Sequence, residues 1–319
     1  MKLVTKVIIG VAATLGVGVI GIVAGANARW DREREAPLPD IKASDDPTVI
    51  ARGEYLVWGP AHCGGCHGAI DRIDEYEKEG KRIPLSGGFE LPIPPATLRM
   101  PNITSHETAG IGAMSDGQIA RSLRHGVARD GRMLFPIMPF QNLSDDDLTA
   151  IISYLRTLEP DATVREPTEF SMLGKVLLGF VMDPAGPTQE VPKSITPAPT
   201  AEYGSYLANS VANCNGCHTN RDLATGDPIG PPFAGGLALE HRGTVYNIPN
   251  ITPKGAGSKL AAYDEAGFIE RIRSRKPSAD GSPMPWAPFA DMSDDDLKAI
   301  YAYLQTVESV DNDVGPVVK

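Results

Sequence analysis

Three blocks from the first half of the chain recur in the second half, in the same order and without gaps. The matched pairs are GEYLVWGPAHCGGCH (53–67) with GSYLANSVANCNGCH (204–218), GGFELPIPPATLRMPNIT (87–104) with GGLALEHRGTVYNIPNIT (235–252), and FQNLSDDDLTAIISYLRTL (140–158) with FADMSDDDLKAIYAYLQTV (289–307). Internal self-similarity indicates homologous structural units. We therefore expect two tandem modules, over residues 47–160 and 200–310.

Each module is predicted to be mostly α-helical with long loops. Residues 47–61 and 199–212 are predicted as short helices that lead into a cysteine pair. Ser144 and Ser293 each precede three aspartates, which predicts a helix start because serine caps the first turn and acidic side chains suit its positive end. Apolar residues follow at helical spacing. No alternating pattern predicts strands between these helices, and 33 glycines and 28 prolines favour irregular loops.

The segment between the modules, residues 161–199, is rich in proline and is predicted to be a linker. It contains one apolar stretch, SMLGKVLLGFVM (171–182). This stretch is too short to span a bilayer, which takes about 20 residues. It could lie on a membrane or on a partner, and we expect it to pack against one of the modules.

The N-terminal 30 residues form a separate segment. Val7–Ala26 carries no charge and follows Lys2 and Lys6. As a helix it would span roughly 30 Å, the thickness of one hydrocarbon core. The alternative is a cleaved signal peptide, because Ala26-Asn27-Ala28 resembles a cleavage site. The apolar run exceeds the usual signal length of about 7–15 residues, so we expect a transmembrane helix within residues 1–30.

All four cysteines lie in two copies of C-x-x-C-H: Cys63, Cys66, Cys214 and Cys217. A redox disulfide would need a thioredoxin-like βαβ unit, and that pattern is missing. A zinc site needs four ligands, and neither module offers a second cysteine or histidine cluster. The remaining meaning of C-x-x-C-H is covalent attachment of c-type haem. The sequence therefore predicts two covalently bound haem c groups.

The axial ligands of the two haems follow from the same pattern. The residue after each cysteine pair falls beneath the iron, which makes His67 and His218 the expected proximal ligands. A methionine as sixth ligand suits electron transfer. We expect Met138 and Met284 in this role, because each precedes a proline that keeps its loop extended. Met284 lies three residues further from its Ser-Asp-Asp-Asp run than Met138 does, so the two ligand loops differ in length.

Other methionines and histidines have more ordinary expected roles. Met133 and Met292 are expected to fill the core, as methionine often does. His106, His125 and His241 could provide bis-histidine ligation instead of methionine. We expect them to be surface or loop residues, since each module already contains a Met-Pro pair.

The formal net charge of −10 bears on the partners of the chain. A nucleic-acid surface needs a basic stripe, so no nucleic acid is expected. An acidic body instead suits docking to the basic patch of a partner protein.

The combination of C-x-x-C-H, Pro-Asn-Ile-Thr, and Met-Pro before a Ser-Asp helix start resembles a known family. It is similar to the cytochrome c subunits of membrane-bound bacterial dehydrogenases for gluconate, alcohol and related sugars. The resemblance covers roughly 47–160 and 200–310 and implies an α-helical cytochrome c fold for each module. It also implies His67 and His218 as proximal ligands and Met138 and Met284 as distal ones. Those subunits commonly carry three haems, whereas this chain has two motifs.

The expected function is transfer of single electrons by a membrane-anchored dihaem cytochrome, without catalysis by the chain itself. The expected partner is a dehydrogenase, a quinol-oxidising complex or an oxidase. Haem is attached to C-x-x-C-H outside the cytoplasm, so we expect a single-pass protein of the bacterial inner membrane with its haem modules in the periplasm. Lys2 and Lys6 agree with a cytoplasmic N-terminus. The alternatives are a dihaem subunit of a terminal oxidase and, with weaker support, a dihaem peroxidase-like enzyme.

Overall fold

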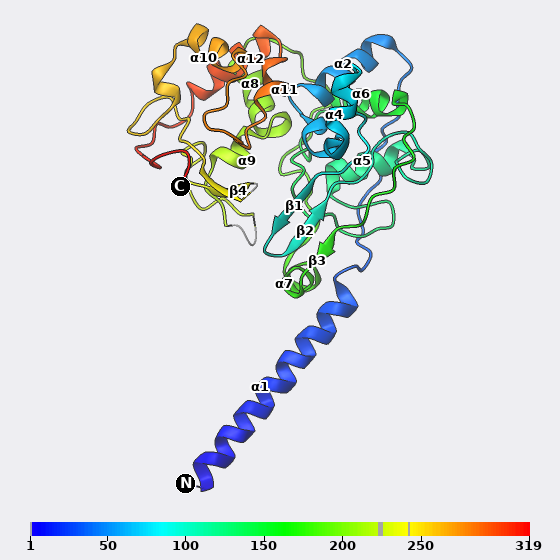
Figure 1. Cartoon of the computed structure of the whole chain (residues 1–319), viewed down its shortest axis with the longest axis vertical. Coiled ribbons are helices and arrows are strands. Elements are labelled where there is room, and N and C mark those ends of the chain that lie inside the picture. The colour runs from blue at the N-terminus through cyan, green and yellow to red at the C-terminus, as the bar shows by residue number, and fades with distance from the viewer. Residues whose placement is uncertain (1, 223–225, 242) are drawn as a thin grey trace.

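The computed structural model describes residues 2–222, 226–241 and 243–319, without the side chains at positions 2, 3, 7, 8, 10–12 and 77. A long N-terminal helix projects from a body made of two lobes (Figure 1). The first lobe contains module 1 and the second contains module 2, and the segment between the modules returns along the base of the first lobe.

Module 1 and the N-terminal segment contain α1 (Lys2–Arg29), α2 (Pro47–Trp58), α3 (Cys63–His67), η1 (Ile70–Arg72), α4 (Ile73–Lys78), β1 (Glu90–Ile93), β2 (Ala96–Arg99), α5 (Asp116–His125) and α6 (Asp145–Thr157). The intervening segment contains β3 (Glu169–Phe170), α7 (Met172–Val176) and the π-helical turn η2 (Leu177–Val181). Module 2 contains α8 (Ala201–Tyr206), the π-helical turn η3 (Leu207–Val211), α9 (Cys214–His218), β4 (Ala238–His241), β5 (Thr244–Asn247), η4 (Leu260–Ala262), α10 (Glu265–Arg273), α11 (Trp286–Ala290) and α12 (Asp294–Leu304).

The predicted helix starts are confirmed. Ser144 precedes α6, and its side chain accepts a hydrogen bond from the Asp147 amide at 3.1 Å. Ser293 precedes α12 and accepts from the Asp296 amide at the same distance. Each serine thus satisfies one of the backbone donors that a helix start leaves without a partner.

Within each module, the first helix crosses the last helix at a glycine. A Cβ atom on Gly53 of α2 would lie 1.9 Å from the carbonyl oxygen of Ala150 in α6. A Cβ atom on Gly204 of α8 would lie 1.8 Å from the carbonyl oxygen of Ala299 in α12. Only a residue without a side chain permits this approach, so the repeated Gly-x-Tyr-Leu motif sets the spacing of the two helix pairs.

The modules join through a reciprocal pair of tyrosines at equivalent positions. The Tyr55 hydroxyl of module 1 donates to Asp296 Oδ2 at 2.6 Å and accepts from the Ser293 amide at 2.9 Å. The Tyr206 hydroxyl of module 2 donates to Asp147 Oδ2 at 2.8 Å and accepts from the Ser144 amide at 3.1 Å. Each module therefore completes the start of the other module's last helix. One continuous apolar core, which includes Leu56, Leu148, Leu207 and Leu297, underlies this junction.

The expectation that no strands lie between the helices is wrong. Strands β1, β2 and β3 form an antiparallel sheet in which Glu90 pairs with Arg99 and Ala96 pairs with Phe170. Strands β4 and β5 form a hairpin in module 2. These strands have two to four residues, which is too short for an alternating pattern to be visible in the sequence. Their pairing is decided by the tertiary fold.

The segment between the modules is also more ordered than a simple linker. It contributes β3 to the sheet of module 1, and α7 and η2 pack against α1. Leu177 and Leu178 of η2 are buried. Among the residues that the structure describes, no helix is long and apolar enough to cross a membrane.

Candidate haem sites

Each C-x-x-C-H motif forms one short helix, and the residue before it has an unusual backbone. His62 precedes α3 with φ of 39°, and Asn213 precedes α9 with φ of 55°. Non-glycine residues seldom adopt this left-handed conformation. Because both modules place it at the same point, the chain turns into each motif in the same way. Cysteines three residues apart on such a turn face the same side.

A backbone carbonyl orients the histidine of each motif. His67 Nδ1 lies 2.9 Å from the Pro101 carbonyl oxygen, and His218 Nδ1 lies 2.9 Å from the Pro249 carbonyl oxygen. A carbonyl oxygen only accepts, so Nδ1 carries the hydrogen and the lone pair of the neutral ring lies on Nε2. Burial lowers the pKa of both histidines, which favours the neutral ring. Each imidazole is thereby prepared to bind a metal through Nε2.

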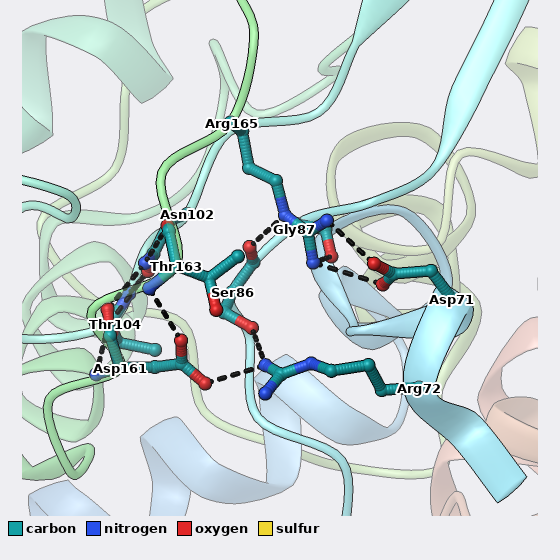
Figure 2. Close-up of polar contacts among 9 residues, drawn as sticks. All are labelled: Asp71, Arg72, Ser86, Gly87, Asn102, Thr104, Asp161, Thr163 and Arg165. Carbon is teal, nitrogen blue, oxygen red and sulfur yellow. Dashed lines mark hydrogen bonds and ion pairs between the residues drawn. The ribbon is translucent and has the colours of Figure 1, made fainter.

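The asparagine after each of these prolines holds the carbonyl in place. In module 1, Asn102 Nδ2 donates to the carbonyl oxygens of Asp161 at 2.8 Å and Thr163 at 3.1 Å (Figure 2). The Asn102 side-chain oxygen accepts from the Thr104 amide at 2.9 Å and from its hydroxyl at 2.7 Å. Both the nitrogen and the oxygen of this buried side-chain amide therefore have hydrogen-bond partners.

Module 2 repeats the arrangement with its own asparagine. Asn250 Nδ2 donates to Val310 at 2.8 Å and Asn312 at 3.5 Å, and its oxygen accepts from Thr252. The Pro-Asn-Ile-Thr block thus fastens the loop that orients each histidine to the segment after the last helix of its module.

Module 1 adds charged residues around the same loop. Arg72 donates to Ser86 Oγ at 2.9 Å and pairs with Asp161 at 2.7 Å. Arg165 forms a bidentate pair with Asp71 and also donates to the carbonyl oxygens of Ser86 and Gly87 (Figure 2). The Gly87 amide in turn donates to the His67 carbonyl at 2.7 Å. The loop after the first motif is therefore held from both sides.

The four cysteines form no disulfide, which leaves their sulfur atoms available for thioether attachment. Burial raises the pKa of Cys63 and of Cys214 to about 12, and it also raises the pKa of Cys66 and Cys217. Cys63 and Cys214 pack against the main core, and Cys66 packs against a second apolar cluster.

The methionines before the last helix of each module differ in burial. Met138 and Met284 are partly buried and pack against the main core. The Met138 carbonyl accepts from Gln141 Nε2 at 2.6 Å, and the Met284 carbonyl accepts from the Trp286 amide at 2.8 Å. Met292 has only 2% of its surface exposed, which fits a core-filling side chain.

The remaining histidines make local contacts. His106 Nδ1 accepts from the amide of Ala109 at 3.1 Å, within its own turn. His125 ends α5, where burial and Arg124 lower its pKa. The ring of His241 lies 6.3 Å from that of Phe89, across the junction of the modules.

The donor set fits c-type haem in both modules. Addition of a thiol S–H across a vinyl group forms a thioether and a C–H bond, so attachment needs no external oxidant. Cys63 and Cys66, or Cys214 and Cys217, would supply the thiols, and His67 or His218 would supply Nε2. When bound, the haem provides a one-electron iron couple. The chain's own part is to hold the imidazole in one orientation.

Several functional residues were missed by the sequence reasoning. The matched Pro-Asn-Ile-Thr blocks were visible as a repeat, yet no role followed from them. In the structure, the proline carbonyl contacts the histidine of the C-x-x-C-H motif, and the asparagine fastens the loop that carries this proline. Tyr55 and Tyr206 also recur at equivalent positions of the two modules, yet no role followed from this recurrence. Their recurrence was the available signal, because a residue that recurs in both copies of a duplicated motif is a candidate for a shared task.

Comparisons with known proteins identify the family of the chain. The family model described as Cytochrome c matches residues 50–159 and 201–308. A diheme cytochrome c-type protein of Cereibacter sphaeroides is 29% identical over 311 residues, which cover 93% of this chain and 98% of that protein. The fructose dehydrogenase cytochrome subunit of Gluconobacter japonicus is 27% identical, over 90% of this chain and 57% of that subunit.

The gluconate 2-dehydrogenase cytochrome c subunit of Pantoea cypripedii is 28% identical, over 86% of this chain and 63% of that subunit. The chain thus spans less than two thirds of the two dehydrogenase subunits and nearly the full length of the diheme protein. Two regions that match one family model, each with a complete attachment motif, account for two haems. The chain belongs to the cytochrome c family and is an electron-transfer protein with two covalently bound haem c groups.

Proposed function

We propose that this dihaem cytochrome is the membrane-anchored electron-transfer component of a dehydrogenase or quinol-oxidising complex. It would accept single electrons from that complex and pass them to a downstream acceptor. The observation that carries the proposal is the pair of matched imidazoles, each oriented by a proline carbonyl at 2.9 Å. The relatives named as cytochrome subunits of fructose and gluconate dehydrogenases support the choice of partner.

The proposed iron ligands are His67 with Met138 and His218 with Met284. A thioether sulfur stabilises ferrous iron and raises the potential. A site closed by methionine also has no open position for peroxide, which separates an electron carrier from a peroxidase. The support for these methionines is their position before a proline, between the motif and the last helix of each module.

The proposed membrane anchor is α1. Large aliphatic side chains described on this helix are more than half exposed: Val4, Ile9, Leu15, Val17, Val19, Ile20 and Ile22. Burial of such a surface away from water is favourable. The predicted span Val7–Ala26 includes positions 7, 8 and 10–12, whose side chains lie outside the described residues. With the haem modules in the periplasm, Lys2 and Lys6 would lie on the cytoplasmic side, in agreement with the positive-inside rule.

The experiment for the proposed function begins with the native complex. Affinity isolation of the chain from membranes should recover a dehydrogenase or quinol-oxidising complex whose substrate reduces the haems anaerobically. The purified chain should keep two haems after acid-acetone extraction, and Cys63→Ala with Cys66→Ala should leave one. Rapid peroxide turnover without such a partner would instead favour the peroxidase-like enzyme.

The anchor needs a separate measurement. The mature protein should begin at or near Met1 and should remain with membranes at high salt. A mature N-terminus at Arg29 would show that the segment is a signal peptide, and membrane association would then have to come from a partner.

A further inference from the structure

Four large apolar side chains are exposed together on the segment between the modules. Met172 and Leu173 of α7 are 40% and 47% exposed, and Phe180 and Val181 of η2 are 50% and 58% exposed. We call these four side chains the apolar foot. Large exposed apolar groups that gather at one place on a protein mark interaction sites rather than ordinary surface. Figure 1 shows α7 at the end of the body where α1 departs.

The apolar foot is fixed to the last turn of α1. Ala26 is fully buried there, and Lys175 Nζ donates to Asn27 Oδ1 at 2.9 Å. Gly25 gives room to the ring of Phe180, since a Cβ atom on Gly25 would lie 2.9 Å from that ring. A surface that covers the end of a helix in this way moves with that helix.

Aromatic rings and cations lie beside the apolar foot. Lys175 lies 5.6 Å from the centre of the Trp30 ring, and Arg29 lies 5.3 Å from the centre of the Phe180 ring. Trp30 also packs against Phe170, with ring centres 5.5 Å apart. Tryptophan, lysine and arginine with apolar stems concentrate at the boundary between lipid tails and water. This composition fits a lipid headgroup region better than it fits a dry protein interface.

The apolar foot is also tied to module 1. The Ser171 hydroxyl donates to the carbonyl oxygens of Pro94 and Pro95, each at 3.1 Å. Phe170 of β3 pairs with Ala96 of β2, in the hairpin that follows the first haem motif. A surface that binds the apolar foot would therefore also fix the orientation of module 1, because backbone hydrogen bonds join the foot to this module.

We propose that the apolar foot lies in the headgroup region of a lipid bilayer, beside the point where α1 leaves the body. This docking rests on the proposed membrane attachment of α1, and it adds a second contact. One helix alone would leave the modules free to tilt about its end. A second contact on the same side holds module 1 in one orientation to the membrane plane, and so limits which face its partner can reach.

The test measures the depth of a nitroxide label on the full haem-loaded chain in lipid nanodiscs that contain no other protein. Labels at Val181→Cys and Leu173→Cys report on η2 and α7. The matched control is Val164→Cys, because Val164 is 80% exposed and lies on the same connecting segment. Collisions with oxygen, which concentrates in lipid, are compared with collisions with a water-soluble nickel complex.

We expect the oxygen-to-nickel ratio at Val181→Cys and Leu173→Cys to exceed that at Val164→Cys by at least about threefold. Ratios equal to the control at both foot positions would overturn the proposal. The apolar foot would then be a contact surface for a protein partner. A label at Ile20→Cys reads the anchor separately. An oxygen-to-nickel ratio at Ile20→Cys as low as that at Val164→Cys would reject the anchor. The two labels on the foot would still test the position of the foot.

Discussion

At the scale of single residues, one carbonyl oxygen decides which nitrogen of the histidine in each C-x-x-C-H motif is free. Pro101 and Pro249 make this contact at the same distance, 2.9 Å, and both begin an identical Pro-Asn-Ile-Thr block. The recurrence indicates that the orientation of the imidazole is the property both copies retain.

The sixth ligands can be tested by removing one sulfur at a time. We expect Met138→Ala and Met284→Ala each to lower the potential of one haem by on the order of 0.1 V and to open that iron to carbon monoxide. Spectroelectrochemistry and carbon monoxide difference spectra measure both effects. The control Met292→Ala removes a core side chain, so it should lower the free energy of unfolding by about 2–5 kcal/mol and leave both potentials nearly unchanged. Carbon monoxide binding by Met292→Ala would mean that the ligand of the second haem was misassigned.

The carboxylate of Asp161 makes module 1 sensitive to acid. Burial opposes its charge, but hydrogen bonds from Thr163 and Arg72 outweigh that effect and lower the pKa of Asp161 to about 2, from an ordinary 3.8. A lowered pKa contributes stability that is complete above the ordinary value and is lost as the pH falls towards 2. Between pH 4 and pH 2 the wild type should therefore lose about 1–2 kcal/mol more than Asp161→Asn. Urea unfolding at each pH measures this, and the exposed Asp45→Asn variant should behave as the wild type does.

At the scale of the elements, the first and last helices of each module approach closely because a glycine lies at their contact. Gly53 and Gly204 each lie against a backbone carbonyl of the partner helix, where a rigid group cannot give way. The motif helices α3 and α9 follow directly after α2 and after α8 with η3. Separation of the crossing would therefore displace the cysteines as well as the helices.

Substitution of either glycine by alanine should destabilise the contact between the two helices. We expect Gly53→Ala and Gly204→Ala each to lower the free energy of unfolding by about 2–3 kcal/mol, because the new methyl group overlaps a carbonyl oxygen. Urea unfolding followed by circular dichroism gives the value. Gly21→Ala is the control, since a Cβ atom there meets nothing within 4 Å. Equal stability of all three variants would show that the helix pairs adjust freely.

At the scale of the whole molecule, the duplication produces an interface with approximate two-fold character. Equivalent tyrosines reach across to equivalent aspartates, and each hydroxyl both donates and accepts. The two sides differ in the partners of the aspartates. Asp147 also pairs with Arg52, at 2.9 Å and 3.1 Å, so its charge is neutralised, whereas the described donor to the Asp296 side chain is Tyr55.

This difference predicts unequal effects of the same substitution. Tyr55→Phe should lower the free energy of unfolding by about 1–3 kcal/mol, because it leaves the buried carboxylate of Asp296 without that donor. Tyr206→Phe should cost less, because Arg52 still satisfies Asp147. Urea unfolding followed by circular dichroism measures the loss of stability in both variants. Tyr76→Phe serves as the control, and a larger effect for Tyr206→Phe would contradict this account.

The sequence alone determined what local spacing can determine. Two cysteines and a histidine within five residues lie on one helical turn wherever that turn is placed, so the sequence could predict α3 and α9 as candidate points of haem attachment. The duplication and the capped starts of α6 and α12 were equally visible, because a cap involves residues only three positions apart. The proposed membrane span is a local property of the same kind, and it stays a prediction.

Only the tertiary structure decided the contacts between distant residues. His67 meets a carbonyl 34 positions away, and Tyr55 meets a carboxylate 241 positions away. The strands β1, β2 and β3 exist because they pair, and their two to four residues carry too little pattern to show this alone. Such contacts depend on how the modules pack, since a hydrogen bond between remote residues forms only after the chain has been brought together by burial of its apolar core.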